Sequence, residues 1–167
     1  MRGIDKTGHP MMSEKEVAII DKLIEERQPK HCFEWGSGTS TSYFPNKHKC
    51  IKSWLSIEHN GHYPEYLKDK INENTTIVWI TNENSYIDCV KQNGEKYDFI
   101  LVDGLYRENC LEVAHKIAKK GAIILLHDSG RLEYKKFIDK YNYKKLCDGE
   151  IKTEDGYAHR GLTLFEK

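Results

Sequence analysis

The sequence lacks long hydrophobic runs and lacks an excess of charge of either sign. Its longest strongly apolar run extends from Gly121 to Leu126, far short of the about 18 residues that a membrane-spanning helix needs. Its 26 Lys and Arg residues balance 26 Asp and Glu residues, so no net positive field is available to hold a nucleic-acid backbone. The first twelve residues, MRGIDKTGHPMM, contain no apolar segment of the kind found in secretory signals. We therefore expect neither a membrane nor a nucleic acid as a partner.

The sequence lacks any closely spaced pair of cysteines. The five cysteines, at positions 32, 50, 89, 110 and 147, form no CxxC pair. An odd number of cysteines also leaves at least one without an intramolecular partner. This pattern favours a reduced, cytoplasmic protein with buried thiols.

Short β-rich apolar runs alternate with segments of helical spacing along most of the 167 residues. This alternation is typical of an α/β sheet. No linker, repeat or low-complexity tract interrupts it, so we expect a single domain over residues 1–167, with residues 1–12 as a flexible lid or arm. The first helix is predicted to begin at the N-cap Ser13, with Glu16 completing a capping box, and to end before Pro29.

Seven strands and five further helices are predicted after the first helix. The runs FILVD and AIILLH are nearly continuous in apolar residues, as expected for central parallel strands covered by helices on both faces. The expected strands are His31–Trp35, Ser53–Glu58, Thr76–Ile80, Tyr97–Asp103, Ala122–His127, Tyr143–Cys147 and Gly161–Phe165. The expected helices are Thr39–Phe44, Tyr63–Asn72, Ser85–Asn93, Arg107–Lys119 and Leu132–Tyr141.

A glycine turn between the first strand and the next helix is the most informative segment. It reads CFEWGSGTSTS, with Gly36 and Gly38 in the turn and a first helical turn made of Ser and Thr. Glycine lets backbone N–H groups approach a ligand closely, and a helix N-terminus favours a carboxylate or phosphate. A dinucleotide-binding fingerprint would need a glycine where this chain has Thr41, so the match to that fingerprint is incomplete.

A carboxylate at the end of the second strand adds to this picture. Glu58 closes the strand WLSIE twenty residues after Gly38, where a carboxylate can accept both hydroxyls of a ribose. Together the turn and Glu58 predict a nucleoside-bearing ligand across the strand ends. An ordinary strand-to-helix turn and a solvated strand end are the alternatives.

Four motifs in order resemble a known family. FEWGSGTS, SIEHN, YDFILVDG and GAIILLHDS are similar to segments of class I S-adenosylmethionine-dependent methyltransferases, and most similar to small O-methyltransferases of the sugar type. The resemblance runs from about Glu14 to Phe165. It implies a Rossmann-like, seven-stranded, mostly parallel sheet whose last strand is antiparallel, with S-adenosylmethionine as cofactor at the carboxyl ends of the strands.

The resemblance also implies roles for residues of the matching motifs. Glu34, with the turn residues that follow it, would surround the methionine part of the cofactor, and Ser40 or Thr41 would reach its carboxylate. Glu58 would hold the ribose, His59 would lie beside the adenine, and Asn82 would contact the adenine amino group. The candidate cofactor-binding residues are Glu34, Gly36, Ser37, Gly38, Thr39, Ser40, Glu58, His59, Asn82 and Asp103.

Acidic residues at two neighbouring strand ends are the candidates for chemistry. Asp103 ends the fourth predicted strand, and His127 and Asp128 lie at the end of the fifth. Because adjacent parallel strands lie about 4.8 Å apart, these side chains can converge on one volume. We interpret Asp103 as the central polar residue and His127 or Asp128 as the proton acceptor. A helix cap at Asp128 and a strand-end role for His127 remain open.

A divalent cation is a second interpretation of the same carboxylates. Asp103 and Asp128 would be the ligands of Mg²⁺ or Mn²⁺, which would gather acceptor hydroxyls and lower their pKa. Some relatives of the family use a metal there with a second acid where this chain has His127, so metal use stays open. Arg107 and Arg131 follow the two strand ends and either pair with these acids or bind the acceptor.

The sequence thus predicts transfer of a methyl group from S-adenosylmethionine to an oxygen of a small-molecule or glycan acceptor, such as a sugar hydroxyl. An NAD-linked oxidoreductase and a non-catalytic S-adenosylmethionine-binding subunit are the alternatives. The segment Asp103-Gly104-Leu105-Tyr106 replaces the Asn/Asp-Pro-Pro-aromatic turn of enzymes that methylate nucleobases, which argues against nucleic acid as substrate. The oligomeric state is open, with a homodimer as one option.

Overall fold

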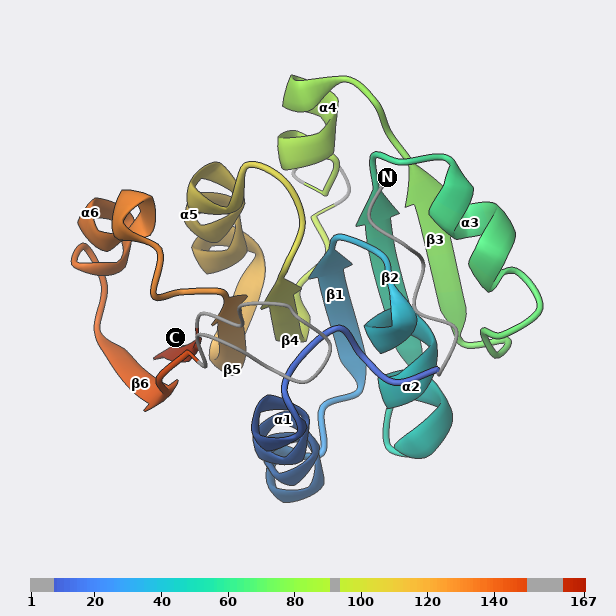
Figure 1. Cartoon of the computed structure of the whole chain (residues 1–167), viewed down its shortest axis with the longest axis horizontal. Helices are drawn as coiled ribbons and strands as arrows, with labels where there is room; N and C mark the ends of the chain where they lie inside the picture. Colours follow the sequence, from blue (N-terminus) through green and yellow to red (C-terminus); the bar gives the residue numbers. More distant parts are fainter. Residues whose placement is uncertain (1–7, 91–93, 150–160) are drawn as a thin grey trace.

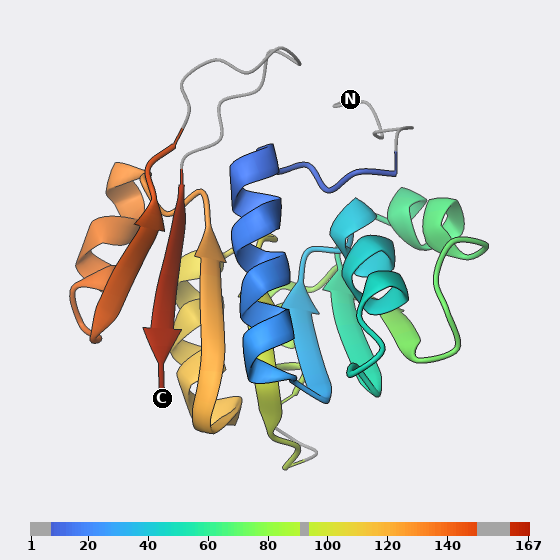
Figure 2. The same cartoon turned by 90° about the horizontal axis from the view of Figure 1, so that it is seen from below.

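A computed structural model describes residues 8–90, 94–149 and 161–167, and it shows a sheet between two layers of helices (Figure 1). The seven strands lie in the order β3-β2-β1-β4-β5-β7-β6. They are β1 His31–Trp35, β2 Ser53–Glu58, β3 Thr75–Trp79, β4 Tyr97–Val102, β5 Ala118–His127, β6 Tyr143–Cys147 and β7 Leu162–Glu166. Only β7 runs against its neighbours β5 and β6 (Figure 2). The predicted Rossmann-like sheet with an antiparallel last strand is confirmed.

Helices cover both faces of the sheet, as predicted from the apolar central strands. They are α1 Glu14–Arg27, α2 Thr39–Lys47, α3 His62–Leu67, α4 Glu83–Asp88, α5 Arg107–Ile117 and α6 Lys135–Ile138, with a 3₁₀ turn at Leu132–Tyr134. One apolar core joins the sheet to α1 and α2 through residues such as Ile20 and Phe44. A second core joins the opposite face to α4, α5 and α6 through residues such as Tyr86 and Leu111. None of the described helices has the length and hydrophobicity of a membrane crossing.

Four helices end earlier than their hydrophobic spacing predicts. Helix α4 ends at Asp88, not at Asn93, and residues 91–93 lie outside the described residues; α6 ends at Ile138, not at Tyr141. Helix α3 ends at Leu67, not at Asn72, because the Asn72 side chain accepts hydrogen bonds from Asn74 N at 3.1 Å and Thr75 Oγ1 at 2.9 Å and so competes with helical bonding. Helix α5 ends at Ile117, not at Lys119, because Ala118 already pairs with Tyr97 of β4. The predicted lid includes residues 1–7, which lie outside the described residues.

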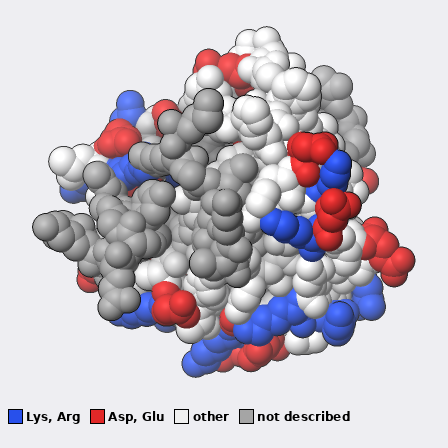
Figure 3. Space-filling view, turned by 45° about the vertical axis from the view of Figure 1, so that its right-hand side comes forward, with Lys and Arg blue, Asp and Glu red and all other residues white. Residues whose placement is uncertain are grey.

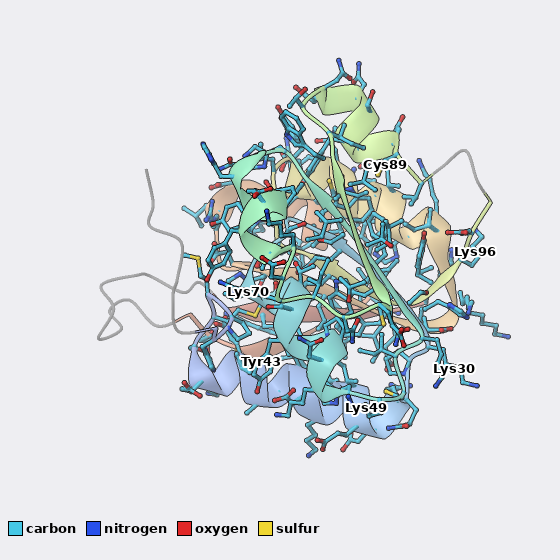
Figure 4. All side chains as sticks on the ribbon, turned by 90° about the vertical axis from the view of Figure 1, so that its right-hand side faces the viewer. Lys30, Tyr43, Lys49, Lys70, Cys89 and Lys96 are labelled. Carbon is cyan, nitrogen blue, oxygen red and sulfur yellow. The ribbon has the colours of Figure 1, made fainter. Side chains whose placement is uncertain are left out.

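Helix α1 is anchored at its start and along its length. Its capping box forms as predicted, with Glu16 N donating to Ser13 Oγ at 3.3 Å and Ser13 N donating to Glu16 Oε2 at 2.9 Å. In the middle of the helix, Asp21 accepts from Lys47 at 2.6 Å and lies 2.7 Å from His48 Nε2. Tyr43 of α2 lies against α1 (Figure 4) and donates to the same carboxylate at 3.3 Å. These contacts hold α1 and α2 together on one face of the sheet.

The turns that follow β1 and β4 touch backbone to backbone. A Cβ on Gly36 would lie 2.6 Å from both N and Cα of Gly104, and a Cβ on Gly104 would overlap the Tyr86 hydroxyl. Gly36 also has a φ of 95°, which side chains rarely adopt. Both positions therefore require glycine so that the two strand ends can meet.

This contact predicts a strong effect of Gly36→Ala on stability. The added methyl group would clash with immobile backbone and would strain the left-handed conformation, so we expect a loss of about 3 kcal/mol and a fall in Tm of about 8 °C. Gly38→Ala is the matched control, because a Cβ there would meet nothing closer than Ser40 Oγ at 3.9 Å. Equal Tm values for the two variants in differential scanning calorimetry would refute the packing argument.

Because of His115 in α5, we expect the stability of the folded state to depend on pH. Its ring stacks on Tyr141 at 3.7 Å, and among the described residues its buried Nε2 has no hydrogen-bond partner. Burial, with the charge of Lys167, lowers the pKa of His115 to about 4, whereas an unfolded histidine titrates near a pKa of about 6.5.

The unfolded chain therefore binds an extra proton between about pH 6.5 and pH 4, so the folded state loses stability as the pH falls through this window. After allowance for partial exposure we expect a loss on the order of 1 kcal/mol. Urea unfolding at about pH 7 and about pH 4.5 measures it, and His115→Phe should shrink the difference. If His115→Phe shows the same difference in the free energy of unfolding between the two pH values as the wild type, other titratable groups cause the loss of stability in acid.

Candidate active site

A cavity of about 370 Å³ opens at the carboxyl ends of β1, β2, β4 and β5. Because β1 lies between β2 and β4, the chain turns in opposite directions on its two sides, and α/β sheets bind ligands at such a point. The lining residues are Met11, Gly36, Ser37, Gly38, Thr39, Ser40, Glu58, His59, Tyr63, Asp103, Gly104, Leu105, Arg107, His127, Asp128 and Arg131. Most of the predicted site residues therefore meet in one place. Glu34 and Asn82 are not among the lining residues.

The glycine turn offers an open cradle and an unsatisfied hydroxyl. Space remains in front of Gly38, whose absent Cβ would meet only Ser40 Oγ. Thr39, 4% exposed, lines the cavity, and its buried Oγ1 has no hydrogen-bond partner in the described part of the chain. Since buried hydroxyls are rarely left unpaired, Thr39 fits a polar ligand group at the start of α2. These features suit the amino-acid part of S-adenosylmethionine.

Glu34 lies beneath this cradle and binds protein groups. Its fully buried carboxylate accepts hydrogen bonds from Ser40 Oγ and Thr41 Oγ1, both at 2.6 Å, and from Trp54 Nε1 and Ser56 Oγ, both at 2.9 Å. Burial raises the pKa of Glu34 to about 7, and these four donors oppose the rise. Glu34 therefore ties the start of α2 to β2. The hydroxyls of Ser40 and Thr41 both point to Glu34.

Glu58 and His59 form the side of the cavity at β2. The Glu58 side chain is 2% exposed and lies 2.9 Å from His59 Nδ1, and it accepts a hydrogen bond from Asn60 N at 2.6 Å. Burial raises the pKa of Glu58 against these contacts and a backbone hydrogen bond from Ser37. Backbone N–H groups hold the Glu58 carboxylate in place. A carboxylate can accept several hydrogen bonds, so Glu58 can still accept hydrogen bonds from a ligand in the cavity.

Asn82 serves as a helix cap. Its side chain accepts a hydrogen bond from Ser85 N at 3.0 Å at the start of α4, which is the usual work of an N-cap asparagine. Its proposed contact with adenine stays a prediction.

Asp103 and His127 form a close pair at the ends of β4 and β5. The distance from His127 Nδ1 to Asp103 Oδ1 is 2.7 Å. Burial lowers the pKa of His127. The charge and hydrogen bond of Asp103, the contact with Glu16 and the charge of Asp128 outweigh burial and raise the pKa to about 10. At neutral pH His127 is therefore an imidazolium that donates to Asp103.

Two arginines complete the charge balance around these acids. Arg107 donates to Gly104 O at 2.9 Å and His127 O at 2.7 Å, and its terminal nitrogens lie 3.1 Å from Asp103 Oδ1 and 3.6 Å from Asp128 Oδ2. Arg131 donates to Asp128 at 2.5 Å. Of the two alternatives for these arginines, pairing with the acids is the one that the structure shows.

The carboxylates of Asp103 and Asp128 do not fit a divalent cation. Each already faces a guanidinium, and His127 adds a third positive charge. Across residues 8–90, 94–149 and 161–167, no cluster of three or more His, Cys, Asp or Glu side chains is arranged to hold a metal ion. On the face shown in Figure 3, basic and acidic side chains lie next to one another along the lower and right edges of the molecule.

The structure adds residues to the site that the sequence interpretation missed. Met11 precedes α1 and reaches the cavity, and Gly104 and Leu105 line it. Glu16 lies 3.5 Å from His127 Nε2 through its Oε2 atom. Its capping box was visible in the sequence but indicated only a helix start, since nothing in the local pattern places that helix against β5.

The chain resembles known proteins in its three-dimensional structure but not in its sequence. No family model matches the sequence, and no curated protein matches it. The O-methyltransferase from Bacillus cereus in complex with S-adenosylhomocysteine superposes with a TM-score of 0.73 at 13% identity, over 93% of this chain and 82% of that one. The O-methyltransferase TomG from Streptomyces achromogenes, in complex with S-adenosylmethionine, gives 0.70 at 13% identity over 93% and 80%.

The fold also occurs with other acceptors. Precorrin-6y C5,15-methyltransferase from Geobacter metallireducens gives a TM-score of 0.64 at 16% identity, over 98% of this chain and 93% of that one. The strand order, the antiparallel β7 and these superpositions agree. The chain has the fold of the class I S-adenosylmethionine-dependent methyltransferases.

Proposed function

We propose that this chain is a methyltransferase that transfers a methyl group from S-adenosylmethionine to an oxygen of its acceptor. The observation that carries the proposal is the cavity that joins the glycine cradle, Glu58 and the Asp103–His127 pair. Thr39 and the start of α2 would hold the amino-acid part of the cofactor, and Glu58 would hold the ribose. When bound, the cofactor supplies a methyl group whose carbon–sulfur bond breaks as the acceptor oxygen attacks, leaving the electron pair on sulfur.

Asp103 is the proton acceptor in this proposal. His127 already carries its proton, and Asp103 directly precedes Gly104, whose backbone touches Gly36 of the glycine turn, so we place the proton acceptor at Asp103 and not at Asp128. In the described part of the chain, His127 and Arg107 both contact Oδ1 of Asp103. Its Oδ2 would take the proton of the acceptor hydroxyl, and His127 would hold the carboxylate in place. Asp128 would keep Arg107 and Arg131 in position.

The acceptor in this proposal is a neutral polyhydroxylated molecule, such as a sugar or a glycan. Arg107 and Arg131 face Asp103 and Asp128, so they are not available as the main contacts of an anionic acceptor. Tyr63 lines the cavity, and Tyr106 is 36% exposed beside the lining residue Leu105, where aromatic faces suit a sugar ring. The same charge balance favours a reaction without a divalent cation.

Binding measurements separate the cofactor alternatives. Isothermal titration calorimetry should show binding of S-adenosylhomocysteine and none of NAD. Gly38→Ala should weaken S-adenosylhomocysteine about tenfold, or about 1.4 kcal/mol, because the methyl group fills the cradle while the fold is unchanged. Binding of NAD alone would favour an oxidoreductase, and full affinity in Gly38→Ala would remove the glycine turn from the site.

Transfer of labelled methyl groups tests the reaction. With a panel of sugars and catechols we expect transfer that persists in EDTA. Asp103→Asn should lower kcat by about 10²-fold or more while leaving S-adenosylhomocysteine affinity unchanged. Loss of transfer in EDTA would contradict the charge argument, and full activity of Asp103→Asn would remove Asp103 as proton acceptor. Cofactor binding without transfer to any acceptor would favour a binding subunit.

A further inference from the structure

Glu16 is buried more deeply than helix capping requires. It is the third residue of α1 and only 1% exposed. Its Oε2 accepts hydrogen bonds from Ser13 N at 2.9 Å and Ser13 Oγ at 3.0 Å, and the same oxygen lies 3.5 Å from His127 Nε2. The cap of α1 and the end of β5 therefore share one carboxylate.

The imidazole of His127 lies between two carboxylates from different elements. Glu16 of α1 faces Nε2, and Asp103, after β4, lies 2.7 Å from Nδ1. Arg107 of α5 donates a hydrogen bond to the backbone oxygen of His127 at 2.7 Å. Asp128 is the residue that follows His127 in the sequence. In this orientation each ring nitrogen of His127 faces a carboxylate oxygen, Nδ1 at hydrogen-bond distance and Nε2 at ion-pair distance.

Capping alone does not explain a charged residue here. Glutamine at the same helix position completes a capping box equally well, and burial of a carboxylate costs free energy unless a charged partner offsets it. In Glu16, burial acts to raise the pKa, but His127 and Ser13 lower it overall, so the charge is retained beside the imidazolium. The negative charge of Glu16 therefore pairs with His127, while the same carboxylate also accepts the capping hydrogen bonds of Ser13.

We infer that Glu16 is a positioning residue, which acts through His127 to hold Asp103 Oδ1 so that Oδ2 faces the acceptor hydroxyl. This inference rests on the proposed function for its catalytic consequence, but the Glu16–His127–Asp103 contacts belong to the free protein. Without the Glu16 charge, the ring of His127 loses the carboxylate that faces Nε2, and the hold of His127 on the Asp103 carboxylate weakens. Misplacement of a reacting group by such motion is enough to slow a reaction strongly.

Glu16→Gln tests the inference, with Ser13→Ala as its matched control. Glutamine keeps the size and the cap but removes the charge, whereas Ser13→Ala removes half of the cap and keeps the charge. We expect Glu16→Gln to lower kcat about tenfold, with acceptor KM and S-adenosylhomocysteine affinity unchanged. Ser13→Ala should lower Tm and leave kcat unchanged. Equal kcat values for wild type and Glu16→Gln, or equal losses in the two variants, would overturn the inference.

Nuclear magnetic resonance of the ligand-free protein gives a readout that does not depend on turnover. Wild type and Ser13→Ala should both show two ring N–H signals of His127, protected from exchange with water. Glu16→Gln should lose protection at Nε2 and keep it at Nδ1, where Asp103 remains. Unchanged protection in Glu16→Gln would overturn the inference even in an active enzyme. The expected loss, in a protein that transfers no methyl group, would instead count against the proposed function alone.

Discussion

The contact between Gly36 and Gly104 is the constraint on which the site depends. A Cβ on Gly36 would lie only 2.6 Å from the facing backbone, so the turns after β1 and β4 leave no room for any side chain. This approach sets the cradle of the glycine turn beside Asp103, the residue just before Gly104. A methyl donor and a proton acceptor must lie within a few ångströms of one another, and the paired glycines bring the two halves of the cavity that close.

Buried charge organises the rest of the cavity. Glu34 holds the start of α2 through four hydrogen bonds, and Arg107 joins the ends of β4 and β5 by contacts to the backbone and to both acids. Asp103 and Asp128 face cations, whereas Glu34 is held by four neutral donors, because a buried carboxylate without partners would cost several kcal/mol. The result is a site of nearly balanced charge. In the function that we propose, this balance favours a neutral acceptor and leaves Asp103 Oδ2 to accept its proton.

Patterns that act along the chain were readable from the sequence. The apolar runs of β4 and β5 predicted central strands, and the glycine turn, Glu58 and the acids after β4 and β5 all fall at one cavity as expected. Contacts between residues far apart in the chain could not be predicted from the sequence. Strand periodicity did not show that Glu34 points to α2, away from the cavity, and a capping box could not show that Glu16 meets His127. Helix α3 ends early because the Asn72 side chain competes with the backbone for hydrogen bonds. The spacing of apolar residues carries no information about this competition.

The most direct measurement is a crystal structure of the protein with S-adenosylhomocysteine. The account predicts that the ribose hydroxyls lie within hydrogen-bond distance of Glu58, that the amino-acid end reaches Thr39, and that the sulfur faces Asp103 across open space for an acceptor. A ligand bound elsewhere, or a Glu58 carboxylate turned away from the ribose, would contradict it.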